Sequence, residues 1–142
     1  MAVVADIDQL SSAISHATAP AFMLGAVAGF LSILIARFER IGDRNRALRS
    51  AEGGAVEPSL REAITACYAR RMDLLSRAIY FAVLSALVTA ALLIGAFFSA
   101  LIGIGHAGVV AMMFVVALAL LMVSLVELTR EIRVHKATMH LD

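Results

Sequence analysis

Apolar positions without any charge follow one another in three long runs. They cover residues 20–36, 78–104 and 107–126. At ~1.5 Å per helical residue the first run measures ~25 Å, and residues 17–19 can lengthen it. The other two reach or exceed the ~20 residues needed to cross the ~30 Å hydrocarbon layer of a bilayer. Strands of a membrane barrel are shorter and alternate in polarity, so the pattern predicts three transmembrane helices.

These runs organise the whole chain as one all-α membrane domain. The chain is 61% hydrophobic and 16% charged, whereas soluble domains are ~45 to 50% apolar and ~25% charged. We therefore expect a single integral membrane domain over residues 1–142. Its parts are spans over about 18–37, 78–103 and 107–127, a cytoplasmic helical hairpin over 38–77 that extends spans 1 and 2, and a cytoplasmic tail over 128–142.

The lysines and arginines lie on one side of this arrangement. Residues 1–36 and the turn 103–108 contain none, nine lie in residues 37–77, and the other three lie in the tail. Lys and Arg in short loops stay on the cytoplasmic side during insertion. The distribution therefore predicts an N-terminus outside the cell and a C-terminus in the cytoplasm.

Five arginines fall within residues 37–49, directly after the first span. Such a cluster is also the usual footprint of nucleic-acid binding. The net charge of +1 offers no overall attraction for a polyanion, so we expect no nucleic-acid partner and interpret the cluster as a collar that contacts anionic lipid headgroups. The charged collar and stalk comprise Arg37, Arg40, Asp43, Arg44, Arg46, Arg77, Glu127, Glu131 and Arg133.

Turn signals divide the cytoplasmic segment into two helical arms. Gly53 and Gly54 are typical of a helix end and Pro58 of a helix start, and a capping box follows over residues 59–62. The two arms are antiparallel, and their apolar positions predict a packed stalk. The expected contacts set Phe38, Ile41 and Leu48 against Leu60, Ile64 and Cys67.

A short amphipathic helix is expected on the outer surface before the first span. Ile7, Leu10, Ile14 and Ala17 recur at three- and four-residue spacing, with polar residues between them. In this interpretation Thr18 caps the next helix and Pro20 occupies its first turn. The alternative is a kink at Pro20.

Four segments together resemble one family of bacterial membrane proteins. They read A-I-S-H-A-T-A-P-A-F-M-L over 13–24, R-F-E-R-I-G-D-R-N-R-A-L over 37–48, R-R-M-D-L-L-S-R-A-I over 70–79 and T-R-E-I-R-V-H over 129–135. The pattern is similar to that of domain of unknown function 2721. The resemblance implies three spans and a bacterial inner membrane, and it assigns no activity.

Candidate chemistry is sparse. Cys67 is the single cysteine, so an intrachain disulfide is excluded, and no sequence motif of a hydrolase, a phosphate-binding loop or a zinc site is present. Glu127, Glu131 and His135 recur every four residues and would share a helix face, which suits a divalent cation or proton transfer. The competing interpretation is a solvated face neutralised by Arg130 and Arg133.

Glu127 is the most conspicuous of these residues because it lies at the edge of the hydrocarbon layer, where an ionisable group is a functional candidate. A structural explanation is pairing with Arg77 or Arg37 at the same depth. We expect no enzymatic activity, no cofactor and no metal.

Small residues form ridges on two spans, where helix backbones can approach closely. These ridges join the helices of one chain or form contacts between subunits. We expect a self-associating structural or accessory membrane protein, as a homo-oligomer or within a larger membrane complex. The alternative is a homo-oligomeric channel gated through the stalk and lined by the hydroxyls of Ser32, Ser85, Thr89, Ser99 and Ser124. The helix-packing positions are Ala21, Gly25 and Gly29 on the first span and Ala82, Ala86, Ala90, Gly95 and Ser99 on the second.

Overall fold

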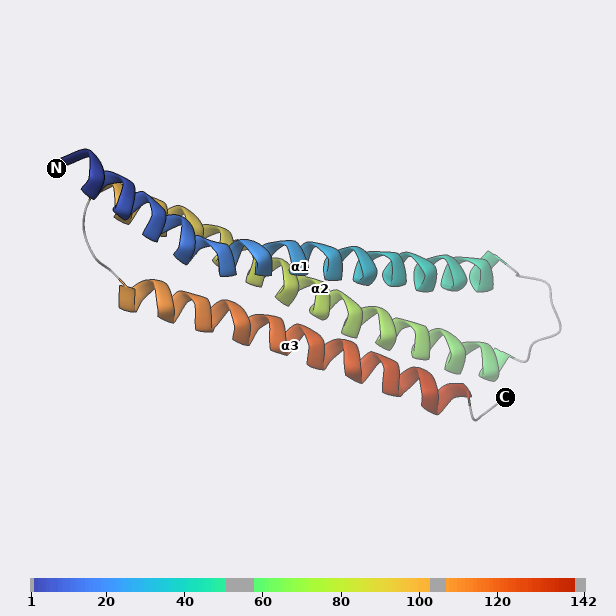
Figure 1. Cartoon of the computed structure of the whole chain (residues 1–142). Coiled ribbons are helices and arrows are strands. Elements are labelled where there is room, and N and C mark those ends of the chain that lie inside the picture. The colour runs from blue at the N-terminus through green and yellow to red at the C-terminus, as the bar shows by residue number, and fades with distance from the viewer. Residues whose placement is uncertain (1, 51–57, 103–106, 140–142) are drawn as a thin grey trace.

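Three long helices make up the described part of the chain. The computed structural model describes residues 2–50, 58–102 and 107–139, and all of them are helical. The helices are α1 (Ala2–Ser50), α2 (Pro58–Ile102) and α3 (Ala107–Met139), and successive helices run antiparallel (Figure 1). α2 packs along both α1 and α3, whereas contact between α1 and α3 is sparse. The central helix therefore holds the other two together.

Each helix contains a segment that is long and apolar enough to cross a membrane. The segments are Ala17–Ala47, Glu62–Ser99 and Gly108–Val134. Soluble monomers rarely expose contiguous apolar patches above ~600 Å², but here large apolar side chains are exposed along all three helices. The prediction of an all-α protein with three membrane-crossing helices is confirmed. Exposed examples are Phe22, Leu87, Ile94, Phe98, Val115 and Met122.

The buried positions follow a seven-residue repeat. This period is typical of helices that wrap around each other with a left-handed supercoil. Apolar residues also occupy most lipid-facing positions of the spans, so hydrophobicity alone does not mark the packed face. The buried set is Ala17, Pro20, Val27, Leu34 and Ile41 on α1, Leu75, Ala78, Ala82, Ser85, Thr89 and Leu92 on α2, and Ala117, Ser124, Glu127 and Glu131 on α3.

The N-terminal residues belong to α1 and not to a separate helix. The prediction that Thr18 caps a new helix is wrong, because its Oγ1 donates to the carbonyl of Ile14 one turn earlier at 3.0 Å. Pro20 lies buried inside α1. Proline removes one backbone hydrogen bond and displaces the carbonyl one turn before it, and α1 bends in its N-terminal half (Figure 1). The structure therefore agrees with the alternative prediction, a kink of a continuous helix at Pro20.

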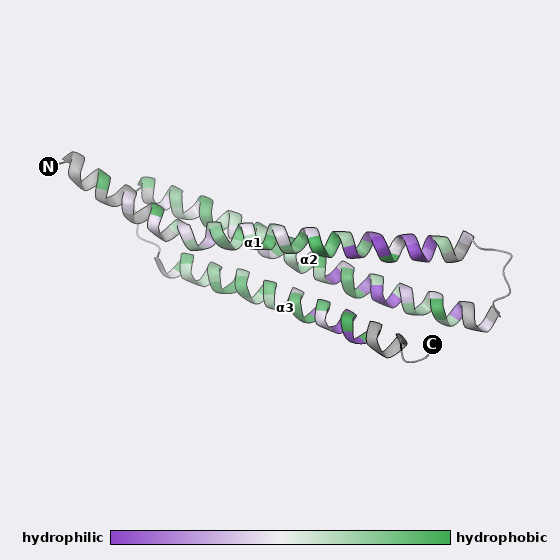
Figure 2. Ribbon diagram, turned by 45° about the vertical axis from the view of Figure 1, so that its right-hand side comes forward, coloured by the Kyte–Doolittle hydropathy of each residue, from purple (hydrophilic) through white to green (hydrophobic). Residues whose placement is uncertain are grey.

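The polar ends of the helices lie together. Figure 2 shows that hydrophilic residues of α1, α2 and α3 gather at the same end of the bundle. There, Ile41 and Leu75 belong to one buried cluster, against which Phe38, Tyr68 and Met72 pack. Of the other expected stalk contacts, Ile64 and Cys67 are half-buried. The side chains of Leu48 and Leu60 lie outside the described residues.

Candidate functional site

A buried carboxylate joins all three helices at the start of the polar end. Glu131 of α3 is 1% exposed. Arg71 of α2 donates from Nε and Nη2 to Glu131 Oε1, at 2.9 and 2.7 Å. Arg37 of α1 donates from Nη1 to Oε2 at 3.2 Å. We call these three residues the Glu131 cluster.

The cluster belongs to a series of polar links between described residues of α2 and α3. Successive links are seven residues apart on both helices, so each recurs on the same packed face. Two further links of the series lie within the apolar spans, where a hydroxyl hydrogen bond across helices contributes ~0.6 kcal/mol on average. The links are Ser85 Oγ to the Ala117 carbonyl at 2.8 Å, Ser124 Oγ to the Ala78 carbonyl at 2.6 Å, and Arg71 to Glu131.

Both oxygens of Glu131 are satisfied, which is the condition for burying a carboxylate. Taking an ion out of water is costly, and removal of one partner of a buried pair destabilises a protein by ~3 to 5 kcal/mol. The side chain of Arg71 is only 12% exposed, whereas that of Arg37 is 44% exposed. Arg71 is therefore the buried partner and Arg37 the partner at the surface.

Glu127 lies one turn before Glu131 and is paired differently. It is 9% exposed, and its Oε1 accepts from Arg130 Nη1 of its own helix at 3.2 Å. Its Oε2 is buried and has no hydrogen-bond partner among the described residues. Glu127 thus combines burial with one unsatisfied oxygen.

The expected pairing of Glu127 with Arg77 or Arg37 is wrong. Arg37 extends instead to Glu131. Arg77 is exposed and pairs with Asp73, one turn away on its own helix, at 3.1 Å. Each arginine therefore has an acceptor other than Glu127.

The interpretation of this face of α3 as solvated is also wrong. Glu127 and Glu131 point into the bundle, and Arg130 neutralises only the former. Arg133 is exposed and forms no ion pair with any described residue. Within residues 2–50, 58–102 and 107–139 no group of three or more His, Cys, Asp or Glu side chains could hold a metal ion, and the side chain of His135 lies outside the described residues.

The rest of the predicted collar is on the surface. Arg40 and Arg44 are exposed and have no ion pair within the described part of the chain. Arg46 and Asp43 are exposed and 3.9 Å apart, a geometry that contributes little in water. Of the collar residues on α1, only Arg37 reaches into the helix bundle.

The small-residue ridges divide between inside and outside. Ala82 is fully buried and belongs to the core cluster between α1 and α2, and Ala86, Ala90 and Ser99 are half-buried. In contrast, Ala21, Gly25, Gly29 and Gly95 are exposed. A Cβ added at any of these three glycines would meet no atom within 4 Å. The ridge on α1 therefore does not join helices of the same chain.

Arg71 is the residue of the Glu131 cluster that the sequence pattern did not single out. Its neighbours Arg70 and Arg77 are exposed on the same helix, so the charge pattern alone does not distinguish it. The distinguishing signal is spacing, because Arg71 lies seven residues before Ala78 and fourteen before Ser85. That repeat becomes visible only once the packed face of α2 is known.

Comparison with known proteins gives one result. The family described as "Protein of unknown function (DUF2721)" matches residues 17–141 of the chain. No curated protein and no solved structure matches it. The matched range includes all three membrane-crossing segments and every residue of the Glu131 cluster. The chain belongs to the DUF2721 family.

Proposed function

We propose that this protein is a non-catalytic, self-associating structural or accessory component of the bacterial inner membrane. The observation that carries the proposal is the ridge of Ala21, Gly25 and Gly29, which is exposed on α1. Lipid gives helices no hydrophobic reason to associate, so close backbone approach at small residues is a main source of helix contact in membranes. The ridge is therefore available to a second subunit.

The orientation follows from the distribution of charge. The hydrophilic end of the bundle holds the C-terminal half of α1, the start of α2 and the end of α3 (Figure 2). Because Lys and Arg are retained on the cytoplasmic side, this end faces the cytoplasm. The stalk and its exposed arginines then lie beside anionic lipid headgroups and cytoplasmic partners.

The internal links favour a structural role over the channel alternative. The hydroxyls of Ser85, Thr89 and Ser124 are buried and donate to backbone carbonyls of the same chain. Ser32, which is exposed, donates to the carbonyl of Ala28 one turn earlier. A ring of subunits built on α1 would therefore have a mostly apolar inner wall, whereas ion pathways use carbonyls, hydroxyls or charges.

The subunit count of the purified protein tests the proposal. We expect an oligomer in mild detergent by size-exclusion chromatography with light scattering. Gly25→Leu should reduce it to smaller species, because the side chain occupies the ridge while leaving the chain's own packing untouched.

The matched control is Ala26→Leu, which is also exposed but lies ~100° around the helix from Gly25, and it should keep the wild-type mass. A monomeric wild type without any co-purifying protein, or equal masses for the two variants, would contradict self-association through this ridge. Ion flux into liposomes that Gly25→Leu abolishes would support the channel instead.

A further inference from the structure

Arg37 has hydrogen-bonding capacity left over. A guanidinium carries five N–H donors, and the structure gives Arg37 one acceptor among the described residues, Glu131 Oε2. Although 44% of the side chain is exposed, its position is fixed by the buried carboxylate. A positioned, partly used arginine at the surface is suited to bind a phosphate by paired hydrogen bonds.

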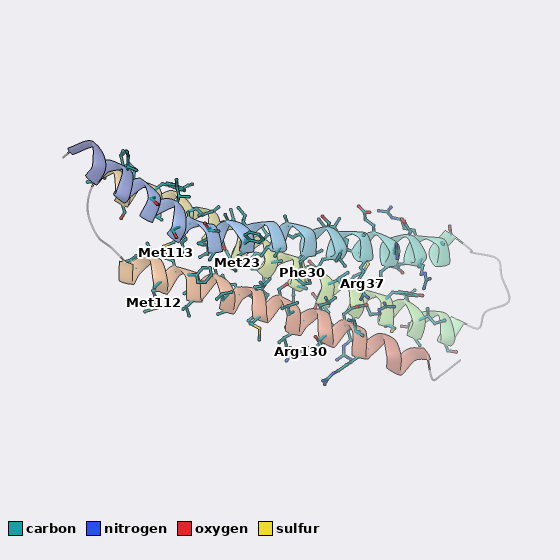
Figure 3. The ribbon with its side chains drawn as sticks, in the orientation of Figure 1. Met23, Phe30, Arg37, Met112, Met113 and Arg130 are labelled. Carbon is teal, nitrogen blue, oxygen red and sulfur yellow. The ribbon has the colours of Figure 1, made fainter. Side chains whose placement is uncertain are left out.

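An apolar strip leads from Arg37 into the span. Met23 and Phe30 precede Arg37 at seven-residue intervals and are half-buried. Part of each side chain packs on α2, because Met23 Sδ accepts from Thr89 Oγ1 at 4.0 Å and Phe30 contacts the core cluster, and Figure 3 shows where the three residues lie along α1. The strip extends ~21 Å along the helix, more than the ~15 Å of hydrocarbon in one leaflet. Contact between α1 and α3 is sparse, so α3 does not cover α1 along its length.

The charge around Arg37 favours an anion. Arg37 and Arg71 share Glu131, and the ion pair of Arg130 with Glu127 begins one turn before Glu131 on α3. These five side chains carry three positive and two negative charges, which leaves one positive charge. Basic sites between transmembrane helices at the cytoplasmic side are typical of lipid headgroup recognition.

We propose that one anionic phospholipid binds to α1 at this position. Its phosphate accepts hydrogen bonds from the unused donors of Arg37, Glu131 holds the guanidinium in place, and one acyl chain packs on Phe30 and Met23. This proposal rests on the membrane orientation given above, and it is independent of self-association. It assigns to Arg37 a specific lipid contact, distinct from the general attraction of the exposed arginines.

Native mass spectrometry of the full chain tests the proposal. The protein is purified from vesicles of equal parts phosphatidylglycerol and phosphatidylcholine, and the lipids retained per chain are counted. We expect one phosphatidylglycerol on the wild type. Arg37→Lys keeps the charge and a donor for Glu131 but loses the guanidinium fork, so retention should fall about tenfold.

The matched control is Arg40→Lys, another exposed arginine of α1 with no ion pair among the described residues, and it should retain the lipid. Phe30→Ala should lower retention while leaving Arg37 paired, and circular dichroism checks that the loss of its contact with the core cluster does not unfold the chain. If circular dichroism shows that Arg37→Lys folds poorly, the lipid retention of Phe30→Ala is compared with that of the wild type instead.

Three outcomes would overturn the proposal. Equal losses for Arg37→Lys and Arg40→Lys would show only a general electrostatic collar. Equal retention of phosphatidylcholine would exclude recognition of an anionic lipid. Displacement of the lipid by millimolar inorganic phosphate, with no effect of Phe30→Ala, would show a site for the free anion. The same spectra report the subunit count, so a monomer that retains the lipid contradicts self-association and leaves this inference intact.

Discussion

Glu127 and Glu131 lie one turn apart on α3, and both are buried, but their surroundings differ. Glu131 accepts hydrogen bonds from arginines of the two other helices. Glu127 accepts one from its own helix and has an unsatisfied oxygen. The comparison teaches that sharing a helix face does not give two carboxylates the same role. Glu131 holds the bundle together, whereas the pairing of Glu127 adds no contact to another helix.

Removal of the Glu131 charge should have the largest effect. Glu131→Gln leaves Arg71 buried opposite a neutral amide, so the free energy of unfolding should fall by ~3 to 5 kcal/mol. Titration of the protein with sodium dodecyl sulfate in mixed micelles, followed by circular dichroism, measures the change. A loss below ~1 kcal/mol would show that the cluster contributes no more than a surface ion pair.

The two arginines of the cluster should differ in the same assay. Arg71→Leu removes the buried partner and both of its hydrogen bonds, so we expect a loss of ~3 kcal/mol. Arg37→Leu removes a partner that is 44% exposed, and solvent screening should limit the loss to ~1 kcal/mol. The reverse order would mean that Arg37 carries the buried charge.

A smaller effect is expected one heptad deeper in the membrane. Ser124→Ala removes the hydroxyl that donates to the carbonyl of Ala78, at a cost of ~0.6 kcal/mol and at most ~1.7 kcal/mol. The control is Ser32→Ala. This exposed hydroxyl donates to a carbonyl of its own helix, so its removal should not measurably change the free energy of unfolding. Equal losses at both positions would argue against an interhelical link.

Glu127→Gln should have a much smaller effect than Glu131→Gln. The amide oxygen can still accept from Arg130, which is 64% exposed, so the stability should change by less than ~1 kcal/mol. A loss as large as that of Glu131→Gln would contradict the distinction between the two carboxylates and would point to a partner for the unsatisfied oxygen.

The architecture follows from the sequence because length and apolarity are enough to predict membrane-crossing helices. The seventeen charge-free residues 20–36 and the two longer runs show the three helices directly. The continuity of α1 through Pro20 is not predictable in this way, since proline suits both a helix start and a kink. In the structure Pro20 is buried inside α1, and the helix bends there instead of starting (Figure 1).

The site is harder to predict because lipid removes the usual contrast between inside and outside. In water a buried face is apolar, but here apolar residues face lipid and the packed face of α2 carries Ala82, Ser85 and Thr89. From the sequence alone, the carboxylates at 127 and 131 are therefore expected to face solvent. Their burial depends on where α2 places Arg71, which is a property of helix register and not of α3 alone.

The direct test of the account is a double-mutant cycle between Arg71 and Glu131, measured as free energies of unfolding in the same micelles. The cycle compares Arg71→Leu, Glu131→Leu and the double variant with the wild type. We predict that the double variant is more stable than the sum of the single losses allows, with a coupling of ~2 kcal/mol or more, because neither charge is left buried alone. Additive losses would contradict the claim that this pair joins α2 to α3.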